Sequence, residues 1–120
     1  MNAAVLGGLV EQWVWRCQKV ASQHQMRQPI DLQAEVDKLV GQAEVEARRL
    51  DGNGPVFLAA LENRLEIRAH IAELPEPLAP EKLTDPVLNA MGRAEALHAF
   101  AAAFGRAVER LKLERLRSAA

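Results

Sequence analysis

The side chains with the most chemical reactivity are three histidines and one pair of carboxylates. His24, His70 and His98 lie far apart in the chain, one in each of three predicted helices, whereas histidines that share a zinc ion usually follow a short, recognisable spacing. Glu62 and Glu66 are four residues apart, so both lie on one face of a helix. That face is polar, and such a pair is more typical of a solvated surface than of a carboxylate site. We therefore predict no catalytic and no metal-binding residues.

The single cysteine and the glycine-rich turn also favour structural roles. Cys17 falls on an apolar stripe, which predicts an inert thiol in the core. Gly52, Asn53 and Gly54 form a turn signal and are not followed by the lysine of a phosphate-binding loop. The sequence contains no dinucleotide-binding fingerprint and no HExxH motif. We therefore expect no enzymatic activity and no cofactor.

The composition is that of one helical domain covering residues 1–120. Hydrophobic residues make up 49% of the chain and charged residues 26%, which is ordinary for a globular protein. Residues that favour helices dominate, and no segment has the pattern of a strand. A single cysteine suggests a reducing compartment, the first residues do not resemble a signal peptide, and no apolar run approaches the roughly 20 residues that span a bilayer. We expect a cytoplasmic protein without a membrane partner.

Hydrophobic periodicity predicts four helices, near residues 3–26, 31–50, 55–74 and 86–117. Asp31 can cap the second helix by accepting from a backbone N–H, and Glu44 and Arg48 are expected to pair on its solvent side. The glycines after Leu50 suit the left-handed residue that ends a helix, and the short turn makes the second and third helices antiparallel neighbours. A linker rich in proline follows over residues 75–85. The predicted fold class is all-α, a small bundle of four helices with a long C-terminal helix, and we expect it to be dimeric.

The segment 55–74 is expected to be the most buried helix, around which the others pack. Its apolar positions spread over more than half of the helical wheel, which is wider than the stripe of a surface helix. Arg64 and Arg68 interrupt this arc on one face. Two interpretations are open. The stems of both arginines can pack while their charged ends reach water, or the arginines can meet acidic groups across an interface, because a buried arginine needs a partner.

The first and last helices carry regular apolar rows and one unusual aromatic residue. Trp13 and Cys17 belong to the row of the first helix, whereas Trp15 points about 200° away from it. We weigh a second contact within the chain against an anchor for a partner at Trp15, because tryptophan is enriched at binding hot spots. In the last helix a heptad row comprises Ala94, Leu97, Ala101, Phe104, Val108 and Leu111, and Phe100 flanks it.

The charge distribution gives little support to nucleic-acid binding. Residues 1–85 carry 9 Lys/Arg and 13 Asp/Glu, residues 86–120 carry 6 and 3, and the net charge is −1. Basic side chains at the end of the last helix could contact phosphates, but cations there also complement the helix dipole, and Glu109 and Glu114 dilute the patch. The second and third helices have the order of a helix-turn-helix, yet a recognition helix needs a polar outer face. A direct DNA-binding regulator is therefore the least favoured function.

A surplus of apolar surface favours binding to other proteins. The last helix is longer than its partners, and the segment 55–74 carries more apolar positions than one core needs, so we expect a homodimer and a further protein partner. We expect an apolar patch of a partner to lie against Phe57, Leu61 and Ile71, with an acidic group near Arg64 and Arg68. Other candidate contacts lie at Trp15, Phe100 and Phe104.

Two functional classes remain open at this point. In the first, the chain is a small non-enzymatic regulatory protein that acts by protein–protein binding, such as an antiactivator that sequesters a bacterial transcription regulator. In the second, it is a chaperone or assembly factor for a secretion or phage apparatus. The sequence does not name the partner in either class.

Overall fold

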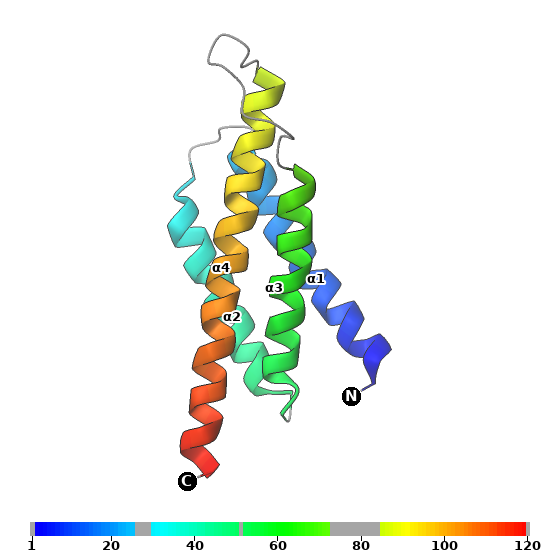
Figure 1. Cartoon of the computed structure of the whole chain (residues 1–120), viewed down its shortest axis with the longest axis vertical. Coiled ribbons are helices and arrows are strands. Elements are labelled where there is room, and N and C mark those ends of the chain that lie inside the picture. Colours follow the sequence, from blue (N-terminus) through cyan, green and yellow to red (C-terminus); the bar gives the residue numbers. More distant parts are fainter. Residues whose placement is uncertain (1, 26–29, 51, 73–84, 120) are drawn as a thin grey trace.

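The computed structural model describes residues 2–25, 30–50, 52–72 and 85–119, and these contain four α-helices (Figure 1). The helices are α1 (Ala3–Gln25), α2 (Leu32–Arg48), α3 (Gly54–Ala72) and α4 (Asp85–Ala119). Their bounds lie within two residues of those expected from periodicity. Successive helices run in opposite directions, so the chain passes up and down the bundle. The proline-rich linker predicted over residues 75–85 lies, up to residue 84, outside the described residues.

The helix ends are fixed by local hydrogen bonds. The side chain of Asp31 accepts a hydrogen bond from the backbone N–H of Ala34 at 3.2 Å, as the sequence predicts for a cap. The side chain of Asn2 caps α1 in the same way, because its oxygen accepts from the backbone N–H of Val5 at 2.8 Å. After α2, Gly52 takes a φ of 92°, which only glycine adopts readily. The turn between α2 and α3 is therefore specified locally.

The helix with the most extensive contacts to the other three is α4, whereas the sequence analysis expects the other helices to pack around the segment 55–74. In Figure 1, α4 lies beside α3 and in front of α1 and α2, and it contacts all three. The heptad row predicted for α4 is entirely buried. By contrast α3 leaves Val56, Ile67 and Ile71 exposed by 56%, 44% and 78%. The reason is that α3 packs mainly along one neighbour, α4, so only part of its wide apolar arc is covered.

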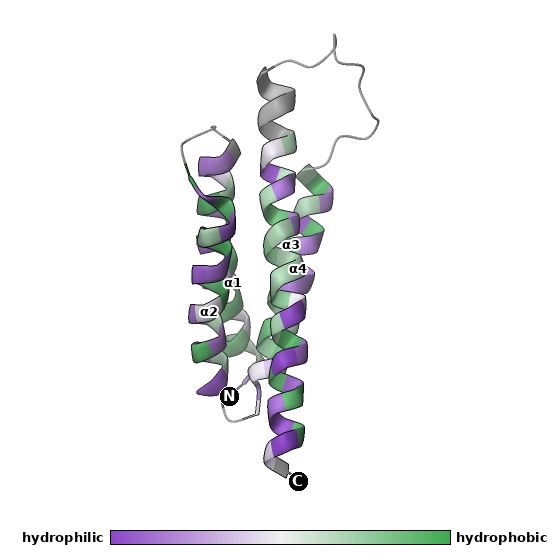
Figure 2. Cartoon of the chain, turned by 90° about the vertical axis from the view of Figure 1, so that its left-hand side faces the viewer, coloured by the Kyte–Doolittle hydropathy of each residue, from purple (hydrophilic) through white to green (hydrophobic). Residues whose placement is uncertain are grey.

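Two glycines, Gly54 of α3 and Gly105 of α4, lie where neighbouring helices approach closely. A Cβ atom at Gly54 would lie 2.5 Å from the backbone oxygen of Ala47 and 3.0 Å from Cδ2 of Leu111. At Gly105, a Cβ would lie 2.9 Å from the carboxylate of Glu62. Figure 2 shows apolar residues gathered where the helices face one another and hydrophilic residues prominent toward the C-terminal end of α4. Within the described residues, no helix is long and apolar enough to cross a bilayer.

Candidate protein-binding surface

Four of the eight residues expected to contact a partner lie instead in the core of the chain. The side chains of Phe57, Leu61, Phe100 and Phe104 are each 0% exposed. Phe100 and Phe104 stack with ring centroids 6.4 Å apart. These residues are buried because the apolar faces of α3 and α4 cover each other. They are therefore not accessible to a partner in this structure, which corrects the sequence-based expectation.

The arginines of α3 find an acidic partner within the chain, on α1. Nε and Nη2 of Arg64 each lie 2.9 Å from Oε1 of Glu11, and Nη2 of Arg68 lies 3.9 Å from Oε2 of the same carboxylate. With the amide of Gln18 oriented so that its oxygen faces α3, it accepts from Nη1 of Arg68 at 2.8 Å. The expected acidic group across an interface is thus already supplied by Glu11. The two arginine side chains remain 42% and 33% exposed, so they still reach solvent.

Trp15 lies on the outer face of α1 and is 63% exposed. Nζ of Lys19 lies 5.7 Å from the centroid of its ring. A shallow open depression of about 420 Å³ lies beside the ring and is lined by Gly8, Glu11, Gln12, Trp15 and Arg16. A Cβ atom at Gly8 would meet nothing within 4 Å, so this glycine leaves a notch in the surface of α1.

The exposed apolar side chains of α1 and α3 lie next to the same ion pairs. Ile67 and Ile71 each follow one of the two arginines by three residues, and Trp15 follows Glu11 by four. Residues at these spacings are neighbours on a helix surface, so all three lie one turn from the Glu11–arginine cluster. We call the set Gly8, Glu11, Trp15, Arg64, Ile67, Arg68 and Ile71 the α1–α3 surface. Sequence reasoning found Trp15, Ile71 and both arginines, and it missed Gly8, Glu11 and Ile67.

The signal for Gly8 was present in the sequence. A glycine inside a helix costs about 0.5–1 kcal/mol relative to alanine, and no close neighbour in the described structure requires it. Glu11 could not be found in the same way, because the pair it forms with Arg64 joins residues 53 positions apart.

A second charged cluster joins α2 to α4, and its centre is Glu44. This residue is only 9% exposed, so the expectation that it lies on the solvent side of α2 is wrong. Oε1 of Glu44 pairs with Nη2 of Arg110, and Oε2 lies 3.5 Å from Nη2 of Arg48. A buried carboxylate needs such partners, because transferring an unpaired charge from water into the interior is very costly.

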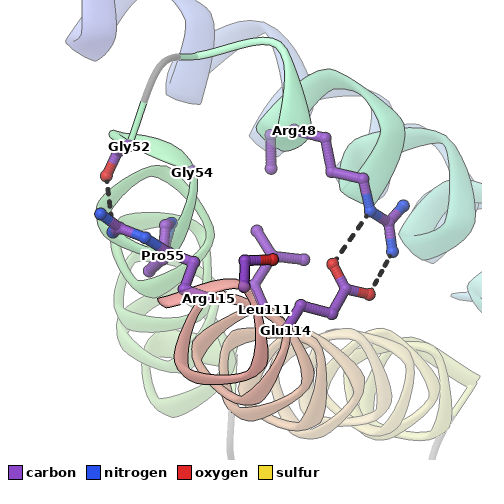
Figure 3. Close-up of a pocket in the computed structure, with 9 residues that line it drawn as sticks. Arg48, Gly52, Gly54, Pro55, Leu111, Glu114 and Arg115 are labelled. Atoms are coloured by element: carbon purple, nitrogen blue, oxygen red, sulfur yellow. Dashed lines mark hydrogen bonds and ion pairs between the residues drawn. The ribbon is translucent and has the colours of Figure 1, made fainter. Parts of the chain in front are cut away.

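The same cluster continues to the end of the bundle, where it closes a pocket (Figure 3). Arg48 holds Glu114 by two hydrogen bonds, Nε to Oε2 at 3.2 Å and Nη2 to Oε1 at 2.9 Å. These bonds lower the pKa of the Glu114 carboxyl and raise the pKa of Arg48. On the other side of the pocket, Nη1 of Arg115 donates to the backbone oxygen of Gly52 at 3.1 Å.

The charged groups that line this pocket have a structural role. The pocket has a volume of about 400 Å³, and it lies between α2, the α2–α3 turn and α4. The charged groups on its wall pair with each other or with the backbone of the turn, so they hold α4 against the turn. The cations Arg48, Arg110 and Arg115 of this region are therefore engaged within the chain, which weakens the case for a phosphate-binding patch at the end of α4.

The other reactive residues have structural surroundings. Cys17 is 0% exposed, and burial raises the pKa of its thiol to about 12, in line with an inert core cysteine. The rings of His70 and His98 meet edge to face with centroids 5.7 Å apart, and Nε2 of His24 lies 3.6 Å from Oε2 of Glu95. In the part of the chain that the structure describes, no three His, Cys, Asp or Glu side chains are grouped to hold a metal ion. Comparison of the chain with protein-family models, curated proteins and solved structures gives no match.

Proposed function

We propose that this chain is a non-enzymatic regulatory protein that acts by binding another protein through the α1–α3 surface. An antiactivator that sequesters a bacterial transcription regulator is the form of this function that we favour. The observation that carries the proposal is the indole of Trp15, which stands 63% exposed beside an open notch. Tryptophan is among the residues that most often dominate the binding energy of protein interfaces.

The chemistry around Trp15 supports a protein partner. Ile67 and Ile71 add apolar area on the neighbouring helix, and fully burying a side chain of this size contributes about 1.5–3 kcal/mol. On the same surface, the side chains of Arg64 and Arg68 still face solvent and keep N–H donors available to a partner. An apolar patch with charged groups beside it is the usual layout of a specific interface. The partner therefore needs an apolar side chain that fits the notch at Gly8 and an acceptor near the arginines.

The proposal is tested by comparing variants on this surface with a control elsewhere. Trp15→Ala removes the anchor, and Gly8→Leu fills the notch without a close neighbour to disturb. Val45→Ala is the matched control, because Val45 is 48% exposed on a different helix, α2. Each chain is immobilised, exposed to extract of its native cells and analysed by quantitative mass spectrometry, with helix content checked by circular dichroism.

We expect one protein to be captured by the wild type and by Val45→Ala, and to be depleted at least about tenfold by both other variants, the loss that corresponds to about 1.4 kcal/mol. If the captured protein is a transcription regulator, adding the purified chain should release it from its DNA in a gel-shift assay. Capture that persists in both Trp15→Ala and Gly8→Leu would refute the assigned surface. A captured component of a secretion or phage apparatus would favour the assembly-factor class over the antiactivator.

A further inference from the structure

Most of the outer face of α4 is not covered by another described element. Ala102, Arg106, Glu109, Leu113 and Leu116 are exposed, whereas Ala99 is partly buried against the core. In Figure 1 this helix lies at the front beside α3, with α1 and α2 behind it, and Figure 2 shows the same two layers from the side. Opposite its buried heptad row runs a second row with the same alternating spacing of three and four residues, which is the spacing of a coiled-coil seam. The second row consists of Ala99, Ala102, Arg106, Glu109, Leu113 and Leu116. We call these six residues the outer row of α4.

The outer row leaves two large apolar side chains in solvent. Leu113 is 52% exposed and Leu116 is 68% exposed. Exposed leucines that are contiguous along one helix face mark a contact surface more often than scattered ones do. Toward the middle of the same row, Arg106 pairs with no carboxylate of the described residues. Glu109 meets only Lys112 there, at 3.5 Å between exposed side chains. The outer row therefore combines exposed apolar side chains with charged side chains that have few ion-pair partners among the described residues.

The two halves of the outer row carry complementary residue types. From its middle, the row presents arginine and then two alanines in one direction, and glutamate and then two leucines in the other. We propose that this face binds a second copy of the chain, with the two α4 helices antiparallel and related by a two-fold axis between residues 107 and 108. Arg106 of each copy then faces Glu109 of the other, Ala102 faces Leu113, and Ala99 faces Leu116.

In this register each of the three facing pairs occurs twice, because a two-fold interface repeats every contact. Each leucine meets an alanine, and alternating large and small residues lets two helices interdigitate. Each arginine meets a glutamate, and opposite charges fix the register of a helix pair. A parallel pair would place Arg106 against Arg106 and Glu109 against Glu109. Charge complementarity therefore selects a second copy in the antiparallel orientation, and this inference does not depend on the partner bound at the α1–α3 surface.

Charge reversal gives the first test, with sedimentation or light scattering over a concentration series as the readout. The wild type is expected to reach twice the 13.2 kDa chain mass. Arg106→Glu and Glu109→Arg should each weaken dimerisation at least about tenfold, because each places like charges opposite one another twice. The double variant Arg106→Glu/Glu109→Arg should restore the dimer, since opposite charges face each other again. Trp15→Ala should leave the dimer unchanged.

Disulfide cross-linking gives the second test and reports the orientation. Two chains, Ala102→Cys and Leu113→Cys, are mixed, and one carries a tag that changes its mass. Cys17 can remain, because it is fully buried. In the antiparallel register residue 102 lies opposite residue 113, whereas two copies of residue 102 are about 16 Å apart along the helix, too far for a disulfide. We expect the mixed disulfide and little product from either chain alone.

Three results would overturn the proposal. The first is a wild type that stays at the monomer mass into the submillimolar range. The second is a double charge swap that does not recover the association lost in the single variants while circular dichroism shows unchanged helix content. The third is efficient cross-linking of Ala102→Cys with itself, which would indicate parallel packing.

Discussion

Replacing Glu44 with alanine tests whether the charged cluster between α2 and α4 stabilises the fold. Glu44 is the buried charged side chain of the described core. Its Oε1 pairs with Arg110 and its Oε2 pairs with Arg48. The substitution removes both ion pairs at once. It leaves the two hydrogen bonds between Arg48 and Glu114 in place, so the contact between α2 and the C-terminal part of α4 is retained.

The expected loss of stability follows from the exposure of the groups that remain. Breaking a fully buried ion pair costs about 3–5 kcal/mol, because an unpaired charge stays behind in the interior. Here the side chains of Arg48 and Arg110 are 46% and 50% exposed, so water can solvate both after the change. The remaining cost is that of a lost charged hydrogen bond, about 1.5–3 kcal/mol. We therefore expect the free energy of unfolding to fall by about 2 kcal/mol, which lowers Tm by roughly 6–12 °C for a chain of this length.

The assay is urea unfolding followed by circular dichroism at a fixed protein concentration. Glu66→Ala is the control, because Glu66 is an exposed carboxylate on α3, and such surface changes usually alter stability by less than about 0.5 kcal/mol. Arg110→Ala and the double variant complete a cycle, and we expect a coupling free energy between the two positions. If Glu44→Ala destabilises no more than Glu66→Ala does, the carboxylate is solvated and the cluster does not hold α2 to α4.

Two further predictions concern titratable groups. Burial raises the pKa of the Cys17 thiol from 9.0 to about 12. At pH 8 a thiol reagent should therefore modify Cys17 only as fast as the chain unfolds. Rapid modification of Cys17 in the folded chain would contradict its burial. Arg48 holds the pKa of Glu114 below its usual value, so its contribution to stability is present above the unfolded pKa and is lost as the pH falls through the folded pKa. Urea titrations from pH 7 to pH 3 should therefore show wild type and Glu114→Gln converging in acid, whereas a constant difference would argue against this pair.

The helices and much of the core could be predicted from the sequence, because their causes are local. Asp31 caps α2 through a backbone N–H three residues away, and Gly52 ends the following turn with a positive φ. The apolar rows of α1 and α4 follow from spacing alone, and the residues named for them are buried as expected. Trp15 was placed off the row of α1 by the same reasoning, and it is exposed.

The identity of the central helix and the composition of the α1–α3 surface were decided only by tertiary packing. Periodicity shows which face of a helix is apolar, but the area that this face buries depends on neighbours that come from distant parts of the chain. Glu44 is buried because Arg110, 66 residues away, reaches it from α4. Arg64 is satisfied by Glu11, 53 residues away. Ile71 stays exposed because α3 packs mainly on α4, and no helix in the described structure covers its outer side.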